Sequence, residues 1–311
     1  MWKYVAFRAG QLLLAPLPRR LAYLAVDIIA WCSYLLARGS RRQVEANLRR
    51  VMGQGASRRQ LDRAVRGVFK HIAYNYLELV RLPKLKRENM NKCIAGIHGK
   101  EHLQQAQDYG RHKGLGVIFT GAHLGPMDMS VQLFAHQGYK INVFMEPLKP
   151  KAVFDLIIKL RASQGVTFLP VGATGLKRAI RALNRGEIVG VVSDRAMQDS
   201  GTVMDFFGAP AVMPVGAAQL AVLTGAPILP TFAVRHGKDK VSLYYEPPIY
   251  PPERPTDDTV QALTKQVVAA LETSIRSHPD QWLVFSPVWT DQPPSPSPEN
   301  TPLRPSGTKP S

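Results

Sequence analysis

Apolar residues follow two different patterns along the chain. In residues 40–82 they recur every three or four positions, which is the spacing of one helix face, and Pro83 ends that stretch. From Gly114 onward, short continuous apolar runs alternate with longer amphipathic ones. The short runs predict strands at 116–120, 141–145, 166–169, 188–193, 228–234, 241–246 and 282–285. The longer runs predict helices at 127–137, 151–163, 175–184, 215–224 and 259–277.

This alternation predicts an α/β fold with a mainly parallel central sheet flanked by helices. The chain has 311 residues, which is enough for one large α/β domain with appendages. We expect three regions: helices over 1–100, the α/β core over 101–290, and a disordered tail over 291–311, which is rich in Pro and Ser.

Most of the charge lies in the first 100 residues. They hold 20 Lys or Arg against 5 Asp or Glu, a net +15 of the chain's +17, and the remaining 211 residues are nearly neutral at +2. Such asymmetry indicates an anionic partner, and the candidates are nucleic acid and anionic lipid. The sequence has no zinc-ligand spacing and no RNA-binding aromatic or Gly-x-x-Gly motif. We therefore expect anionic membrane lipids as partners and no nucleic acid.

An apolar run over 21–37, with arginines on both flanks, favours the lipid interpretation. Its 17 residues are at the short limit for a membrane span. Asp27 near its middle would cost about 2.5–3.5 kcal/mol in the bilayer centre. We expect residues 1–37 to form membrane-associated helices at the bilayer interface, and a buried core helix is the alternative. No small-residue cleavage site follows, which argues against a removed signal peptide.

His123 and Asp128 are the main candidates for catalysis. They follow the predicted strand 116–120, and Gly125-Pro126 between them forces a turn. The imidazole is thereby presented at the carboxyl edge of the sheet, where open α/β sheets bind their ligands. A carboxylate five positions on can fold back, accept the imidazole N–H and raise the basicity of the ring. The spacing is typical of a general-base dyad without a protein nucleophile, and a structural histidine is the alternative.

Three further charged residues are candidates for the same edge. Arg161 ends the predicted helix 151–163, where it would hold a phosphate or an oxyanion, unless it is a solvated surface arginine. Asp194 and Arg195 follow the apolar strand 188–193. Asp194 would be a second carboxylate near His123 and Arg195 an anion contact, or the two form a structural ion pair.

The remaining chemistry in the sequence is sparse. Residues 205–216 predict an apolar loop, which either lines a long apolar pocket together with the helix and strand that follow, or belongs to the core. Cys32 and Cys93 form neither a disulfide framework nor a metal site, which fits a reduced, cytoplasmic setting. We expect no metal, because His123 has no ligand-spaced partners.

Several motifs stand in a fixed order over roughly residues 20–290. They are His123-Leu-Gly-Pro-Met-Asp128, Arg161 ahead of Gly165, Asp194-Arg195, Asp205-Phe-Phe-Gly208, Thr224-Gly-Ala-Pro227, and the element from Pro279-Asp-Gln-Trp282 to Trp289. In this order they resemble the motifs of the bacterial lipid A late acyltransferases (lauroyl and myristoyl transferases) and of the related phosphatidylinositol mannoside acyltransferases. One departure is that the acidic residue which often precedes Asp-Phe-Phe-Gly in the mannoside-type members falls here on Val203 or Met204.

The resemblance implies an acyltransferase-type fold and an enzyme on the cytoplasmic face of the inner membrane, peripheral or monotopic. It implies transfer of a fatty acyl group from acyl-CoA or acyl carrier protein, as co-substrate and without other cofactor, to a hydroxyl of a glycolipid or phospholipid acceptor. His123 would be the base and Asp128 its orienting carboxylate, with no acyl-enzyme. Arg161 would hold the donor's phosphates or the oxyanion, and Arg195 the anionic headgroup.

Two alternatives to this assignment stay open. One is a lysophospholipid or glycerol-phosphate acyltransferase, whose usual Pro-Glu-Gly-Thr-type phosphate motif does not occur in this sequence. The other is a non-catalytic protein that binds membrane lipid.

Overall fold

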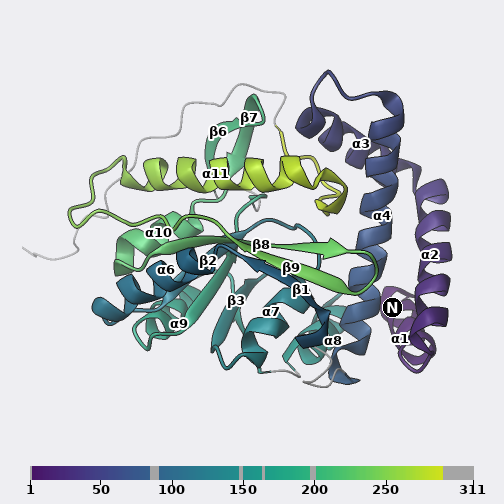
Figure 1. The fold of residues 1–311 in the computed structure, drawn as a ribbon, viewed down its shortest axis with the longest axis horizontal. Coiled ribbons are helices and arrows are strands. Elements are labelled where there is room, and N and C mark those ends of the chain that lie inside the picture. The colour runs from purple at the N-terminus through teal and green to yellow at the C-terminus, as the bar shows by residue number, and fades with distance from the viewer. Residues whose placement is uncertain (1, 85–90, 147–149, 163–164, 197–200, 290–311) are drawn as a thin grey trace, which may run out of the picture.

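A computed structural model describes residues 2–84, 91–146, 150–162, 165–196 and 201–289. The tail predicted to be disordered, 291–311, lies outside these residues. At the centre is a seven-stranded sheet in the order β1-β9-β8-β2-β5-β3-β4 (Figure 1). Its strands are β1 Ile94–His98, β2 Val117–Gly121, β3 Ile141–Met145, β4 Thr167–Pro170, β5 Ile188–Val192, β8 Ile228–His236 and β9 Lys240–Tyr245. Every neighbouring pair is parallel except β8 and β9, so the mainly parallel sheet is confirmed.

Helices cover both faces of this sheet because its strands are apolar on both sides. Ile118 of β2 packs in a cluster with residues of α9 Ala173–Leu183, α10 Gly216–Thr224 and α11 Thr259–Ser277. Its neighbours Val117 and Phe119 point to the other face, against α6 Lys100–His112 and α7 Met127–His136. α8 Lys151–Ala162 packs with Met145 of β3 in a smaller cluster.

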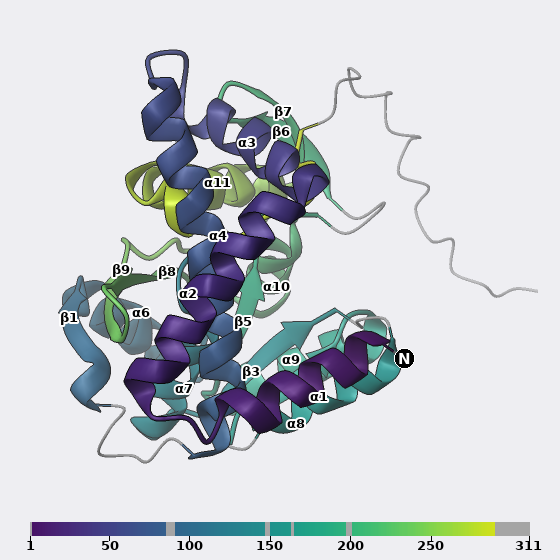
Figure 2. The same cartoon turned by 90° about the vertical axis from the view of Figure 1, so that its right-hand side faces the viewer.

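Residues 1–100 are not helical throughout as predicted, because β1 at 94–98 joins the central sheet. The helical part lies before it. It consists of α1 Trp2–Leu14, α2 Arg19–Leu36, α3 Arg38–Met52 and α4 Arg58–Arg81, followed by the short turn η1 Leu82–Lys84. In Figure 2, α2 runs alongside α4, and α1 lies beside α8. Buried residues of α3 and α4 belong to the same apolar cluster as the sheet, so these helices pack directly on the α/β part.

Taken singly, none of the described helices has the length and apolar character needed to cross a bilayer. By length and composition, α2 and α3 would do so only as a pair, and the chain bends by 89° between them.

Three parts of the fold differ from the sequence prediction. Residues 282–285 are not a strand: the short helix η2 Pro279–Gln281 is followed by a single bridge between Trp282 and Leu124. The expected loop 205–216 contains a hairpin of β6 Thr202–Phe206 and β7 Ala209–Met213, which turns at Phe207 and Gly208, both with positive φ. β1 was not predicted either, because its Ala and Gly interrupt the apolar run of an edge strand.

Candidate active site

His123 lies where the sequence predicts it, at the carboxyl edge of the sheet. β2 ends at Gly121 and α7 begins at Met127, so the loop between them is short. Gly125 turns this loop with a φ of +61°, and a Cβ there would lie 2.1 Å from the carbonyl oxygen of Ala233. Only glycine fits this close approach, and it allows the chain to place His123 against the neighbouring strand end.

The partner of His123 is Asp194, which follows β5. Asp194 Oδ1 lies 2.8 Å from His123 Nδ1, and Asp194 Oδ2 accepts the backbone N–H of His123 at 2.9 Å. β2 and β5 are adjacent parallel strands, so the residues that follow them converge at one edge. The Asp194 carboxylate is fully buried, whereas the imidazole is 35% exposed. Of the two uses proposed for Asp194, the structure places it as a carboxylate at the imidazole and not as an ion-pair partner of Arg195.

Asp128 is not placed as the sequence interpretation expected. It pairs with Arg161, whose Nε lies 2.5 Å from Asp128 Oδ1 and whose Nη2 donates to Oδ2 at 2.9 Å. Asp128 sits in the first turn of α7, and that helix directs its carboxylate toward the end of α8 instead of back to the imidazole. The alternative of a solvated Arg161 does not hold, because three quarters of its side chain is buried.

Arg195 pairs with an acidic residue that the sequence interpretation missed. Its Nη2 donates to Glu146 Oε2 at 3.2 Å, and both side chains are about one third exposed. Glu146 follows β3, which lies next to β5, so it reaches the same edge as Arg195. The rule that singled out Asp194, a charged residue directly after an apolar strand, would also have found Glu146.

Trp282 is the second functional candidate without a role in the sequence interpretation. Its indole Nε1–H donates to Asp194 Oδ2 at 2.7 Å, and the residue is almost fully buried. No local pattern indicates this contact, because the two residues are 88 positions apart.

The loop that carries His123 is also held by hydrogen bonds from α4 and from residues 281–283. Asn75 of α4 donates to the carbonyl oxygen of Gly125 at 2.8 Å, and the carbonyl oxygen of Gln281 accepts the Gly125 N–H at 2.9 Å. The backbone N–H of Leu283 donates to the carbonyl oxygen of His123 at 2.7 Å. Residues from both ends of the chain therefore fix the backbone around the imidazole.

Electrostatics favour an anionic Asp194 beside a basic imidazole. Burial alone would lower the pKa of His123, but the charge and hydrogen bond of Asp194 outweigh it and raise that pKa above its ordinary value. Burial alone would raise the pKa of Asp194, and here His123, the Trp282 indole and the backbone N–H together hold it below its ordinary value. Because Nδ1 is engaged by the carboxylate, Nε2 is the nitrogen left for proton transfer. The arrangement is that of an oriented general base.

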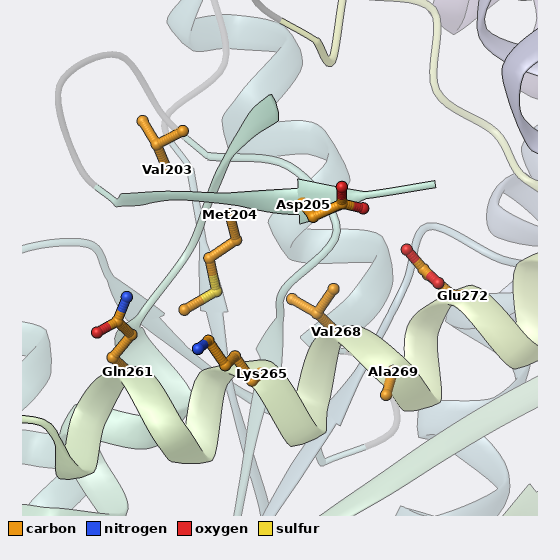
Figure 3. Close-up of a pocket in the computed structure, with 8 residues that line it drawn as sticks. All are labelled: Val203, Met204, Asp205, Gln261, Lys265, Val268, Ala269 and Glu272. Carbon is orange, nitrogen blue, oxygen red and sulfur yellow. The ribbon is translucent and has the colours of Figure 1, made fainter. Parts of the chain in front are cut away.

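Two hollows lie away from these residues. One, of about 450 Å³, is formed between the β6–β7 hairpin and α11, and Figure 3 shows Met204 and Val268 facing each other across it. The other, of about 560 Å³, lies at the amino ends of β3 and β4. The residues expected to wall an apolar pocket are mostly core: Leu220, Ile228 and Leu229 are buried. Among the described residues, no group of three or more His, Cys, Asp or Glu is arranged to hold a metal ion.

Comparison with known proteins gives one consistent result. A family model described as bacterial lipid A biosynthesis acyltransferase matches residues 1–291. The phosphatidylinositol mannoside acyltransferase of Mycobacterium tuberculosis (strain CDC 1551 / Oshkosh) is 28% identical over 297 residues, covering 91% of this chain and 87% of the relative. The protein of the same description from Mycolicibacterium smegmatis is 26% identical over 290 residues, covering 92% and 90% respectively.

Proposed function

Because the chain belongs to the bacterial lipid A biosynthesis acyltransferase family, we propose that it moves a fatty acyl group from an acyl thioester to a hydroxyl of a glycolipid or phospholipid. The thioester is acyl-CoA or acyl-loaded acyl carrier protein. The observation that carries the proposal is the His123–Asp194 pair at the carboxyl edge of the sheet, with Nδ1 and Oδ1 2.8 Å apart. The names of the mannoside acyltransferase relatives favour a glycolipid acceptor.

In the proposed reaction His123 is the general base. Its Nε2 takes the proton of the acceptor hydroxyl while the oxygen attacks the thioester carbonyl, so that a C–O bond forms and the C–S bond breaks. The imidazolium then returns the proton to the departing thiolate, which leaves as the free thiol. Asp194 stabilises the imidazolium without taking its proton, and no acyl-enzyme forms.

The two arginines are proposed to hold the anionic parts of the substrates. Arg161 keeps Asp128 on one side, and its Nη1 faces the weak acceptor Sδ of Met145 at 3.4 Å. An oxyanion or a phosphate oxygen of the donor is a much stronger acceptor and would replace the sulfur. Arg195 is one third exposed, and we place its guanidinium against the anionic headgroup of the acceptor.

We further propose that the enzyme works on the cytoplasmic face of the inner membrane as a peripheral or monotopic protein. The support is the outer face of α2, where a set of large apolar side chains is exposed: Leu21, Leu24, Ile28, Ile29, Trp31, Leu35 and Leu36. Arginines flank it at both ends, at 19 and 20 and at 38, 41 and 42. A continuous apolar face with a basic rim fits the interface of an anionic bilayer.

The direct test removes the base. His123→Ala is expected to lower the release of free thiol from acyl-CoA, measured with a glycolipid acceptor in mixed micelles, by about 10²–10⁴. His112→Ala, which removes an exposed histidine at the end of α6, is the matched control and is expected to keep full turnover. Near wild-type turnover of a folded His123→Ala protein would refute the mechanism. Tight lipid binding without turnover by the wild type would instead favour the non-catalytic alternative.

A further inference from the structure

Trp282 has one polar atom, and that atom is directed at the site. Its indole ring is among the largest fully buried side chains, and Nε1 lies 2.7 Å from Asp194 Oδ2. We propose that Trp282 is a positioning residue that orients the Asp194 carboxylate and keeps it anionic, and thereby sets the basicity of His123. This inference rests on the proposed function of His123 as the base.

The hydrogen bonds of Asp194 show why the indole matters. Among the residues that the structure describes, Oδ1 bonds the imidazole alone, while Oδ2 accepts both the backbone N–H of His123 and the indole N–H. The carboxylate is fully buried, so no water replaces a lost donor. Indole donates a hydrogen bond and has no proton to exchange near neutral pH, so it stabilises the carboxylate without competing with His123 for a proton.

The backbone at residues 282 and 283 also contacts the loop that carries His123. Trp282 forms a bridge with Leu124, and the next residue, Leu283, donates its N–H to the carbonyl oxygen of His123. Residues 282 and 283 therefore contact the backbone beside the base, while the Trp282 side chain holds the carboxylate. One short segment thus fixes both members of the dyad relative to each other.

The ring itself is fixed by an aromatic cluster. Phe206, at the end of β6, lies edge-on to Trp282 with ring centroids 6.2 Å apart, and Trp289 does the same at 6.1 Å. The hairpin that supplies Phe206 is tied to α11, since Glu272 accepts the backbone N–H of Phe207. Figure 3 shows the Glu272 side chain extending from α11 toward β6, where Asp205 lies. The hairpin therefore serves as a wall behind the indole.

The test is Trp282→Phe, which keeps an aromatic ring and removes the N–H. Without this donor the carboxylate is less stabilised, so the dyad takes up a proton more easily and the pKa of His123 rises. The expected result is a kcat about tenfold lower, an unchanged KM for the thioester, and an acid limb of the pH–rate profile at higher pH.

Trp289→Phe is the matched control. It also removes an indole hydrogen bond from the same cluster, but that bond is partly buried and goes to the carbonyl oxygen of Phe206 at 2.6 Å and not to the dyad. Both variants are expected to lower the melting temperature, and only Trp282→Phe is expected to move the acid limb. Equal acid limbs in the two variants would show that Trp282 serves packing alone.

An NMR titration of the His123 imidazole makes the test independent of turnover. An upward shift of its pKa in Trp282→Phe supports the inference even if no acceptor is turned over, in which case only the proposed function fails. An unchanged pKa overturns the inference whatever the activity. If Trp282→Phe does not fold, replacement of the indole at position 282 by benzothiophene removes the N–H at constant ring size and decides the same question.

Discussion

Two carboxylates at one edge of the sheet serve different partners, and their surroundings explain why. Asp194 is fully buried and holds the imidazole, whereas Asp128 is partly exposed and pairs with Arg161. A buried carboxylate whose oxygens are filled by an imidazole, an amide and an indole is held in one orientation. Both oxygens of Asp128 lie on the Arg161 guanidinium, and neither is bonded to the imidazole. We therefore propose that Asp194, and not Asp128, orients the imidazole.

Asp194→Asn is therefore expected to reduce kcat by about 10²–10⁴, because the amide neither stabilises the imidazolium nor selects its tautomer. Asp128→Asn is expected to reduce kcat less, since it leaves the imidazole hydrogen bond in place. Initial rates of thiol release at saturating substrate make the comparison. A larger loss for Asp128→Asn would return the orienting role to that residue.

The direction in which the acid limb of the pH–rate profile moves in Asp194→Asn is an independent test. In the proposed mechanism His123 acts only when neutral, and its pKa is raised above the ordinary 6.5, so activity is expected to fall as the pH drops through that raised value. With the negative charge removed, burial dominates and lowers the pKa of His123. The acid limb of Asp194→Asn is thus expected to move to lower pH, opposite to the shift for Trp282→Phe.

Single residues at strand ends were the most predictable part of the site. His123, Asp194 and Arg195 all follow apolar strands, and a rule about the carboxyl edge finds them from sequence. The pairing of these residues was not predictable, because it depends on which strands are neighbours. β2 pairs with β5, and no local pattern states that. Trp282 was hidden for the same reason, since its partner comes from a distant part of the chain.

Among the elements, α4 connects the N-terminal helices to the loop that carries His123. Its Glu78 forms a buried ion pair with Arg235 of β8, and its Asn75 accepts from Arg235 at 2.6 Å while donating to Gly125. Gln281 caps the same arginine, accepting its backbone N–H at 2.8 Å and donating to its carbonyl oxygen at 2.9 Å. Three elements thus meet at Arg235 behind the site: α4 bonds its guanidinium, and Gln281 bonds its backbone.

Glu78→Gln is expected to destabilise the protein by about 3–5 kcal/mol, because it leaves the fully buried Arg235 charge uncompensated. Urea unfolding followed by circular dichroism measures the change in the free energy of unfolding. Asp155→Asn, which breaks the exposed Lys151–Asp155 pair on α8, is the control and is expected to change it by less than about 1 kcal/mol. Equal effects would mean that the Glu78–Arg235 pair adds nothing beyond a surface contact.

Elements were predicted from sequence where the apolar pattern was strong. The buried strands β2, β3 and β5 coincide closely with the predicted runs, since burial on both faces requires continuous apolar sequence. The β6–β7 hairpin was taken for a loop because its turn falls on Phe207, a residue that rarely adopts positive φ. The continuous apolar run 282–285 predicts a strand. In the structure its side chains pack in the apolar and aromatic cluster instead of joining a sheet.

At the scale of the whole molecule, two exposed faces differ in chemical character. The face of α2 is apolar with arginines around it, and the face of α9 carries charged residues that stay in solvent. Asp27 of α2, which would oppose bilayer insertion, is bonded by Tyr74 and by Lys238 and so is directed toward the body of the protein. The sequence indicated the basic, apolar character of this region, and the fold separates its inner and outer sides.

Leu24→Ser and Ile28→Ser are each expected to weaken binding to phosphatidylglycerol vesicles roughly tenfold, because each removes an apolar side chain from the proposed contact. Leu223→Ser is the control, since Leu223 is equally exposed but lies on α10. Co-sedimentation at two salt concentrations measures the binding and its electrostatic part. Unchanged binding in both α2 variants, or preferential binding to duplex DNA, would contradict the membrane assignment.

The hydrogen bonds from residues 281 to 283 also bear on when the enzyme becomes active during its own synthesis. A chain leaves the ribosome from its N-terminus, so α1 to α4 emerge first. The segment η2, which packs against α4, emerges much later. His123 and Asp194 emerge well before Trp282, which completes the hydrogen bonds of Asp194. A nascent chain interrupted after α11 thus carries both residues of the dyad but lacks the hydrogen bonds that residues 281–283 give to Asp194 and to the loop of His123. We therefore expect full activity only after translation has passed the last residues that order the proposed site.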